Sequence, residues 1–468
     1  EFRRVLFRSS GKGKEYAYRS YFGRVMYSYA DRYLFQANIR HDGSSRFAKK
    51  HRWGTFPSFS AGWVLSEENF MKNLNWEWLS FLKIRATWGA LGNERIGDFP
   101  YMSTIAFGNT IFYQNNGIYF DQTASQQKYA IENVTWEKTE STDIGLDISF
   151  LNNRLRVNGD YYWKNTKDML LAMAIPDFLG FSDPDVNAGK MSTKGYELNV
   201  SWNDHIGDFS YGIAINFSDF TSKMGDLQGT QFLGDKVKME GSEFNEWYGY
   251  VSDGLFLTEE DLKNSPKIND KNTQLGDIKY KDISGPDGVP DGKISPEYDR
   301  VLLGSSLPHF LYGGNINLGY KNFDLSLAFQ GVGKQNARLA REMVEPFRNN
   351  YGNFPAIIDG NYWSPYNTDE QNTVAKYPRL THVNKSSNYA MSDYWLFNGG
   401  YFRLKNITLG YTFPKEWMNA IGIKGARIYA SASDLFCLSK YPKGWDPEMG
   451  VSEYPITTSI LLGVSVNF

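Results

Sequence analysis

The acidic segment 276–300, GDIKYKDISGPDGVPDGKISPEYDR, contains the residue types that could hold a metal ion. Its carboxylates Asp282, Asp287, Asp291 and Asp299 offer the hard oxygen ligands that Ca²⁺ prefers, and a glycine directly follows two of them. Two prolines disturb the regular spacing of an EF-hand loop. The segment therefore has two interpretations, a Ca²⁺ site or a solvated acidic turn, and we predict no other cofactor.

Aromatic residues in the segments between predicted strands form a second candidate site. Tyr113 and Tyr119 lie in TIFYQNNGIYF, and Trp247 and Tyr248 lie in NEWYGY. Their flat apolar faces with polar edges could stack on sugar rings. Packing of these side chains within their own loops is the alternative interpretation for each of the four.

Patterns that indicate catalysis are weak. The stretch GVGK at 331–334 lacks the earlier glycine of a phosphate-binding loop and has Gln335 where Ser or Thr must hold magnesium. The five His show no HExxH or other paired spacing, and no Ser, Cys or Thr lies in a nucleophile elbow. Carboxylate pairs for glycoside hydrolysis depend on a separation in space that sequence does not give. We predict that the chain is not an enzyme.

Composition limits the elements that can position these residues. The 468 residues include 50 basic and 52 acidic ones, so the net charge of -2 argues against a nucleic-acid partner. Aromatics make up 16% of a chain whose mean hydropathy is -0.49, which suggests β-structure with few helices. No stretch approaches the roughly 18 apolar residues of a membrane helix, which excludes helical membrane proteins only. The single cysteine, Cys437, allows no internal disulfide.

Apolar and polar residues alternate throughout the chain, which is the pattern of strands with one apolar face. In DIGLDISF (143–150) the isoleucines, leucine and phenylalanine share one face, and aspartates, glycine and serine share the other. The stretches YELNVSW (196–202) and YGIAINF (211–217) repeat this pattern, and so does the terminal SILLGVSVNF (459–468). We count about 13 such strands and predict an all-β fold.

The connections between these strands fall into a short and a long class that alternate along the chain. The long connections lie near residues 41–53, 91–136, 166–193, 220–308, 333–399 and 434–457. Alternation of short periplasmic turns with long extracellular loops is typical of antiparallel transmembrane β-barrels, and Tyr and Trp near strand ends fit their aromatic girdles. A soluble β-sandwich or up-and-down barrel has the same alternation with the apolar face turned inward. We favour the membrane barrel because loops this long are uncommon in compact soluble domains.

Several stretches, in this order, resemble the SusC/RagA-like TonB-dependent receptors of the Bacteroidota outer membrane. They are RHDGSSRF (40–47), WGTFPSFSAGW (53–63), LKIRATWGALGN (82–93), NVTWEKTESTDIGLDISF (133–150), NAGKMSTKGYELNVSW (187–202), YPRL (377–380), YFRLKNITLGYTFP (401–414) and WDPE (445–448). Together they span nearly everything after residue 20.

The resemblance implies a large plugged barrel of 22 strands, of which about 13 strands are only a part. Residues 11–468 would then be the C-terminal portion of the receptor barrel, with the plug and the first strands absent. Residues 1–10, EFRRVLFRSS, fit nothing that follows, and we interpret them as a non-native or disordered leader.

The resemblance also implies a function at the cell outer membrane. Receptors of this family import oligosaccharides or peptides, with energy relayed by TonB and a SusD-like surface lipoprotein as the lid over the barrel. The expected partners are that lipoprotein, the TonB complex through segments absent here, outer-membrane lipid and the substrate. The alternative function is that of a secreted soluble β-rich protein that binds carbohydrate or degrades glycans.

Overall fold

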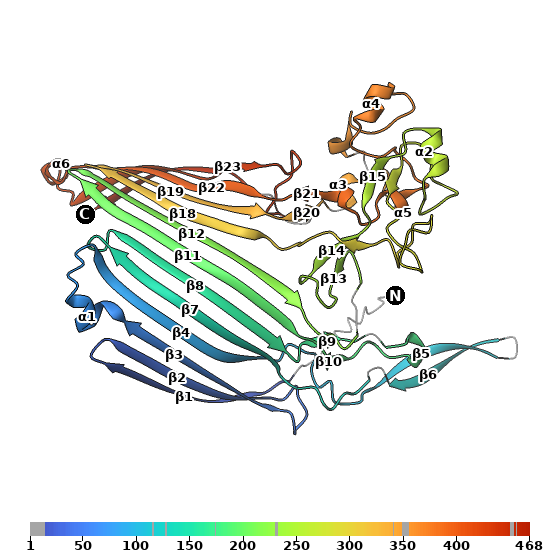
Figure 1. Ribbon diagram of the computed structural model, residues 1–468, viewed down its shortest axis with the longest axis horizontal. Coiled ribbons are helices and arrows are strands. Elements are labelled where there is room, and N and C mark those ends of the chain that lie inside the picture. Colours follow the sequence, from blue (N-terminus) through green and yellow to red (C-terminus); the bar gives the residue numbers. More distant parts are fainter. Residues whose placement is uncertain are drawn as a thin grey trace, which may run out of the picture.

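One large sheet dominates the computed structural model, which describes residues 15–114, 117–126, 129–173, 175–229, 233–339, 341–348, 355–449, 454 and 456–468 (Figure 1). The predicted leader of residues 1–10 lies outside these described residues. The sheet has 13 strands, and their order in space is their order in the chain. These strands are β1 (Tyr18–Tyr29), β2 (Tyr33–Ser44), β3 (Trp53–Val64), β4 (Leu79–Asn93), β7 (Glu137–Phe150), β8 (Leu155–Lys167), β11 (Met191–Ile206), β12 (Phe209–Met224), β18 (His309–Tyr320), β19 (Phe323–Lys334), β22 (Tyr401–Thr412), β23 (Gly425–Ser439) and β24 (Ser459–Asn467).

Every neighbouring pair in this sheet is antiparallel, so the predicted number and arrangement of strands are confirmed. Pairing places apolar residues opposite one another: Leu198 faces Phe217 and Val200 faces Ile215 across β11 and β12. The terminal strand β24 pairs with β23 in the same way, with Leu462 opposite Ala430. A shift of one residue would move every side chain of a strand to the other face, so the alternation fixes the register.

The apolar face of the sheet is open to its surroundings. Ile84 is 40% exposed, Ile144 50%, Leu198 40% and Ile215 47%, although all four lie in central strands. In the described part of the chain no helix is longer than six residues, and no second sheet packs over this face. The soluble sandwich needs such a layer, whereas a lipid-facing surface does not.

The opposite face of the sheet is polar and internally bonded. Arg85 of β4 donates to Asp160 of β8 at 2.7 Å and to Asp147 of β7 at 3.3 Å. Asn158 of β8 donates to the same Asp147 at 2.8 Å. A water-facing wall of polar side chains that satisfy one another across strands is the inner surface expected of a large barrel.

Connections alternate between the two edges of the sheet, but their lengths do not follow the predicted classes everywhere. Residues 45–52 lie on the edge of the long loops, yet they are fewer than residues 65–78 on the other edge, which form the 3₁₀-helix η1 (Leu65–Glu67) and α1 (Asn69–Lys72). The carboxylate of Glu68 accepts bonds from Tyr33 at 2.6 Å and Trp63 at 3.0 Å. These bonds fix the longer turn against the strand ends.

Aromatic side chains gather at this short-turn edge. Tyr33 stacks between Tyr29 and Trp63, with ring centroids 6.4 Å apart in each pair. Trp78 stacks on Phe150 at 5.8 Å. Such a band fits the aromatic girdle that the sequence predicts at a membrane interface.

The remaining elements lie in the connections. Short strands there are β5 (Ile105–Gln114), β6 (Gly117–Gln126), β9 (Leu170–Ala172), β10 (Asp185–Asn187), β13 (Lys236–Val237), β14 (Glu246–Gly249), β15 (Ser252–Leu255), β16 (Ile278–Tyr280), β17 (Val301–Leu302), β20 (Asn336–Arg338) and β21 (Leu396–Asn398). The helices are α2 (Glu259–Asn264), α3 (Arg341–Val344), α4 (Asp369–Thr373), α5 (Lys385–Asn388) and α6 (Lys415–Ala420), with 3₁₀-helices η2 (Asp177–Leu179), η3 (Ala356–Ile358) and η4 (Asp393–Trp395). No helix among the described residues is both long and apolar enough to cross a membrane.

Candidate functional site

The described residues of the two longest connections, 225–308 and 335–400, fold together into one body at the long-loop edge of the sheet, which we call the loop unit (Figure 1). Its buried hydrophobic cluster draws on both connections. The members are Tyr250, Leu255, Ile278, Tyr280, Ile294, Leu339, Met343, Val344, Ile358, Tyr377, Tyr389 and Trp395. Because each connection supplies about half of this core, neither can bury its apolar side chains alone.

A buried carboxylate joins the two connections of the loop unit. Asp277 has no exposed surface, and it accepts hydrogen bonds from Arg379 at 2.7 and 3.2 Å. The side-chain amides of Asn384 and Asn388 each donate to it at 2.8 Å. A buried charge is tolerated when it is paired and hydrogen-bonded, and here every donor side chain comes from the other connection.

Tyrosines inside the loop unit are held in their neutral form. Burial raises the pKa of Tyr280, Tyr389 and Tyr394 well above the usual value for this side chain. The Tyr280 hydroxyl donates to the carbonyl of Ser387 at 2.7 Å. A phenolate at this position would lack solvation and could not donate this hydrogen bond, so the interior of the loop unit stabilises the neutral phenol.

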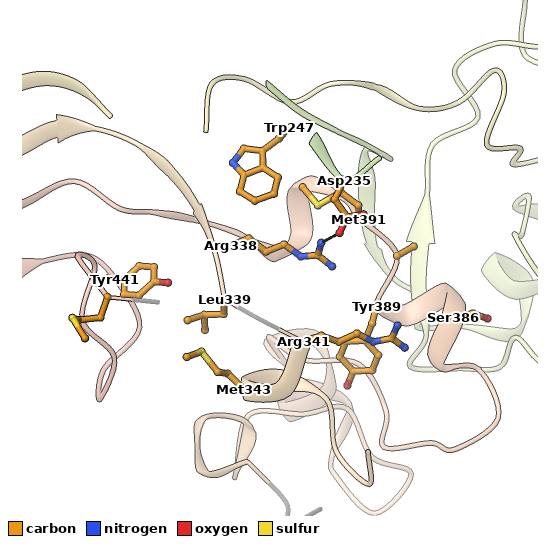
Figure 2. Close-up of a pocket in the computed structure, with 12 residues that line it drawn as sticks. Asp235, Trp247, Arg338, Leu339, Arg341, Met343, Ser386, Tyr389, Met391 and Tyr441 are labelled. Atoms are coloured by element: carbon orange, nitrogen blue, oxygen red, sulfur yellow. Dashed lines mark hydrogen bonds and ion pairs between the residues drawn. The ribbon is translucent and has the colours of Figure 1, made fainter. Parts of the chain in front are cut away.

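A cavity of about 590 Å³ lies beside the loop unit, and we call it the rim cavity (Figure 2). Residues from three connections line it, because Tyr441 and Met449 come from 440–458. Figure 2 shows aromatic rings and two guanidinium groups around it. Those side chains are Trp247, Arg338, Arg341, Tyr389 and Tyr441.

Contacts with neighbouring groups fix the polar and aromatic side chains of the rim cavity. The indole nitrogen of Trp247 donates to the carbonyl of Asn336 at 2.6 Å. Arg338 forms an ion pair with Asp235, and Arg341 forms one with Glu345 at 2.5 Å. Since each guanidinium already has a carboxylate partner, the site offers aromatic faces and directed N–H donors with little net charge.

A third connection is held to the sheet by ion pairs at the same edge. Arg403 of β22 is only 3% exposed, and it contacts Asp446 at 2.5 Å and Glu448 at 2.8 Å. Both acids belong to the WDPE stretch. This network positions residues 440–449, whose Tyr441 and Met449 form one wall of the rim cavity.

The structure separates the four aromatic residues that the sequence singled out. Trp247 lines the rim cavity and is 9% exposed, and Tyr248 packs under the guanidinium of Arg300, 4.4 Å from its ring centroid. Tyr113 and Tyr119 lie on the β5–β6 hairpin, which projects from the body, and are 73% and 53% exposed (Figure 1). Of the four, only Trp247 therefore lines the cavity, and sugar binding by all four stays a prediction.

Several residues of the rim cavity carry no signal in the sequence. Arg338, Arg341 and Tyr389 lie in the connection 335–400, far along the chain from Trp247. No motif or spacing distinguishes them from other loop residues, and only the joint folding of the connections brings them together.

The acidic segment forms a tight turn organised by its own backbone. Asp299 is fully buried and accepts the backbone N–H groups of Ile283, Ser284 and Ser295 at 2.7 to 3.2 Å. Its two oxygens are thus already used.

The other three residues predicted as Ca²⁺ ligands lie nearer the surface. Asp282 accepts the N–H of Gly292 at 2.6 Å, Asp291 accepts that of Lys293 at 2.9 Å, and Asp287 is exposed. Within the described ranges, no three His, Cys, Asp or Glu side chains group closely enough to hold a metal ion. The Ca²⁺ site stays a prediction.

Comparison with known proteins agrees with this architecture. The family model "TonB dependent receptor-like, beta-barrel" matches residues 4–435. TonB-dependent receptor SusC of Bacteroides thetaiotaomicron is 32% identical over 96% of this chain and 43% of its own length. TonB-dependent receptor P3 of Formosa agariphila is 32% identical over 92% of this chain and 42% of its own. The chain spans less than half the length of these curated relatives.

Solved structures show the same fold. The chain superposes on a chain of the RagAB peptide transporter with a TM-score of 0.78 at 23% sequence identity, covering 97% of this chain and 47% of the other. The matched strands, the exposed apolar face and the family model all describe one architecture. The chain belongs to the family of TonB-dependent receptor-like β-barrels, which are proteins of the outer membrane.

Proposed function

We propose that this chain is the C-terminal portion of the barrel, residues 11–468, of a receptor that imports oligosaccharides or peptides across the outer membrane. The observation that carries the proposal is the similarity to SusC, which extends over 96% of this chain. The plug and the first strands would belong to the rest of the receptor. TonB would supply energy through those segments, and a SusD-like lipoprotein would cover the loops.

The two faces of the sheet support this role. The apolar face, with Ile144 and Ile215 half exposed, suits contact with lipid. The polar face, with the Arg85, Asp147 and Asp160 network, suits the water-filled interior through which a polar substrate passes. The rim cavity lies at the long-loop edge, where a substrate would first meet the receptor.

The geometry favours binding and transfer over catalysis. Both guanidinium groups of the rim cavity are paired with carboxylates, and apart from Asp235 and Ser386 its remaining lining is aromatic and apolar. Aromatic faces suit sugar rings, and guanidinium donors suit the carbonyl and carboxylate groups of peptides. We propose that the receptor has no enzymatic activity.

Uptake by cells tests the proposal. The complete gene is deleted in the source bacterium and restored as wild type, as Trp247→Ala or as Trp417→Ala, and uptake of fluorescent oligosaccharides and peptides is measured. Trp247 lines the rim cavity, whereas Trp417 of α6 is 58% exposed at the opposite edge. We expect deletion to abolish uptake of one substrate class, Trp247→Ala to reduce it several-fold, and Trp417→Ala to leave it unchanged.

Two outcomes would contradict the proposal. One is that deletion changes the uptake of none of these substrates. The other is that the receptor is extracted from the membrane fraction without detergent and shows no heat-modifiable migration on a gel. The lid is tested separately, because we expect a surface lipoprotein to co-purify with the detergent-extracted receptor.

A further inference from the structure

A second pocket, of about 610 Å³, lies at the end of the loop unit that points away from the sheet, and we call it the tip pocket. Figure 1 shows α2 and α4 near each other at this end. The pocket is lined by α2, by the residues after it and by the segment that precedes α4. It shares no lining residue with the rim cavity.

An aromatic side chain stands fully in solvent at the edge of the tip pocket. Tyr366 is 96% exposed, although the turn that carries it is tightly bonded. Asn367 donates to the carbonyl of Tyr362 at 2.9 Å, and Asn372 and Ser364 exchange two bonds of 3.0 Å. A fixed turn thus displays a large aromatic ring that gains nothing from burial in this chain.

A second aromatic ring forms the base of the tip pocket. The backbone of Trp363 donates to Tyr377 at 3.0 Å. A Cβ added to Gly276 would lie 2.3 Å from ring atoms of Trp363, so this ring rests directly on the glycine backbone. Gly276 has a φ of +83° and precedes the buried Asp277. The backbone next to the buried Asp277 therefore supports the ring, and a ring that is already positioned lowers the entropic cost of binding.

The polar groups around these rings indicate the chemistry of the ligand. Arg379 is the only cation among the described residues lining the pocket, and Asp277 already engages it. No unpaired cation is therefore present to hold a phosphate or carboxylate. Glu259 and Gln274 offer a carboxylate and an amide, which bind hydroxyl groups. Flat rings beside such groups match a ligand with an apolar face and hydroxyls at its edge.

We propose that the tip pocket binds a neutral saccharide ring, stacked on Tyr366 and Trp363 and hydrogen-bonded by Glu259 and Gln274. It is a surface subsite separate from the rim cavity. This inference rests on the proposed function, because a receptor for oligosaccharides gains from holding a second part of a long chain before import.

Binding to the purified full-length receptor in detergent tests the subsite. The probes are neutral hexasaccharides of α-1,4-glucan, β-1,3-glucan, β-1,4-xylan and β-1,4-mannan, measured by calorimetry. We expect at least one to bind, and we expect Tyr366→Ala to weaken that binding roughly fivefold or more. Tyr366→Phe keeps the ring and should retain binding. Tyr298→Ala, at a 39% exposed tyrosine outside the pocket, is the matched control.

Three results would overturn the subsite. They are the binding of no probe to the wild type, equal affinity of Tyr366→Ala and wild type, and displacement of the saccharide by a neutral hexapeptide of equal affinity. None of them depends on transport. If the receptor imports substrate normally and fails this binding test, the subsite is refuted and the proposed function stands. If uptake is lost while Tyr366-dependent binding remains, only the proposed import is contradicted.

Discussion

Replacing Asp277 with alanine should loosen the loop unit while leaving the sheet intact. The carboxylate of Asp277 is fully buried and accepts bonds from Arg379, Asn384 and Asn388, so its removal leaves one guanidinium and two amides without this acceptor. All three donors belong to the connection 335–400. The two long connections would then lose their buried ionic link, while the apolar cluster and hydrogen bonds such as that from Tyr280 to Ser387 still join them.

The expected magnitude follows from the environment of the pair. Removing one partner of a buried ion pair costs about 3–5 kcal/mol. The side chain of Arg379 is 15% exposed, so part of its charge regains solvent, and we take the lower end, about 3 kcal/mol. A free-energy loss of that size raises local opening roughly a hundredfold.

Hydrogen exchange on the purified receptor measures this opening. The amide of Ile278 donates to Asn388 at 2.9 Å and the amide of Tyr250 donates to Met391 at 2.8 Å, so both should exchange about a hundredfold faster in Asp277→Ala. The control is Asp270→Ala, because that side chain is 85% exposed and its carboxylate lies 3.9 Å from the ammonium group of Lys267. Unchanged exchange in the loop unit, or equal acceleration in β11 and β12, would refute the reasoning.

Three further predictions concern the rim, the tyrosines and the acidic turn. Arg403→Met should raise the rate of protease cleavage within residues 440–449 roughly tenfold or more, with unchanged heat-modifiable migration, because Arg403 holds Asp446 and Glu448. Resistance equal to that of the wild type would refute the anchoring. Burial raises the folded-state pKa of Tyr280, so the neutral phenol stabilises the folded loop unit fully below about pH 10, and this stabilisation is lost as the pH rises further. The stability of the loop unit, measured against pH, should therefore fall above about pH 10, and it should fall less in Tyr280→Phe. Added Ca²⁺ should raise the melting temperature of the wild type and not of Asp282→Asn if the segment 276–300 binds the ion, whereas no rise in either would establish a solvated turn.

The sequence carried most of the information about the sheet. Alternation in stretches such as 143–150 and 196–202 assigned each side chain to a face, because side chains of a strand point alternately to opposite sides. The positions of the connections gave the antiparallel order. Their lengths were less informative, since the bonds of Glu68 to Tyr33 and Trp63 stabilise a longer turn at the short edge.

By itself, then, the sequence determined which residues share the apolar face of the sheet and which share the polar face, because that choice is local and repeats every two residues. Only the tertiary structure decided what the long connections do. Trp247, Arg338 and Tyr389 form one cavity because 225–308 and 335–400 share a core. Asp277 is a structural anchor because side chains of the other connection surround it, and Asp299 is one because the backbone of its own turn folds around it. Contacts between distant segments have no period in the sequence, so only the folded chain reveals them.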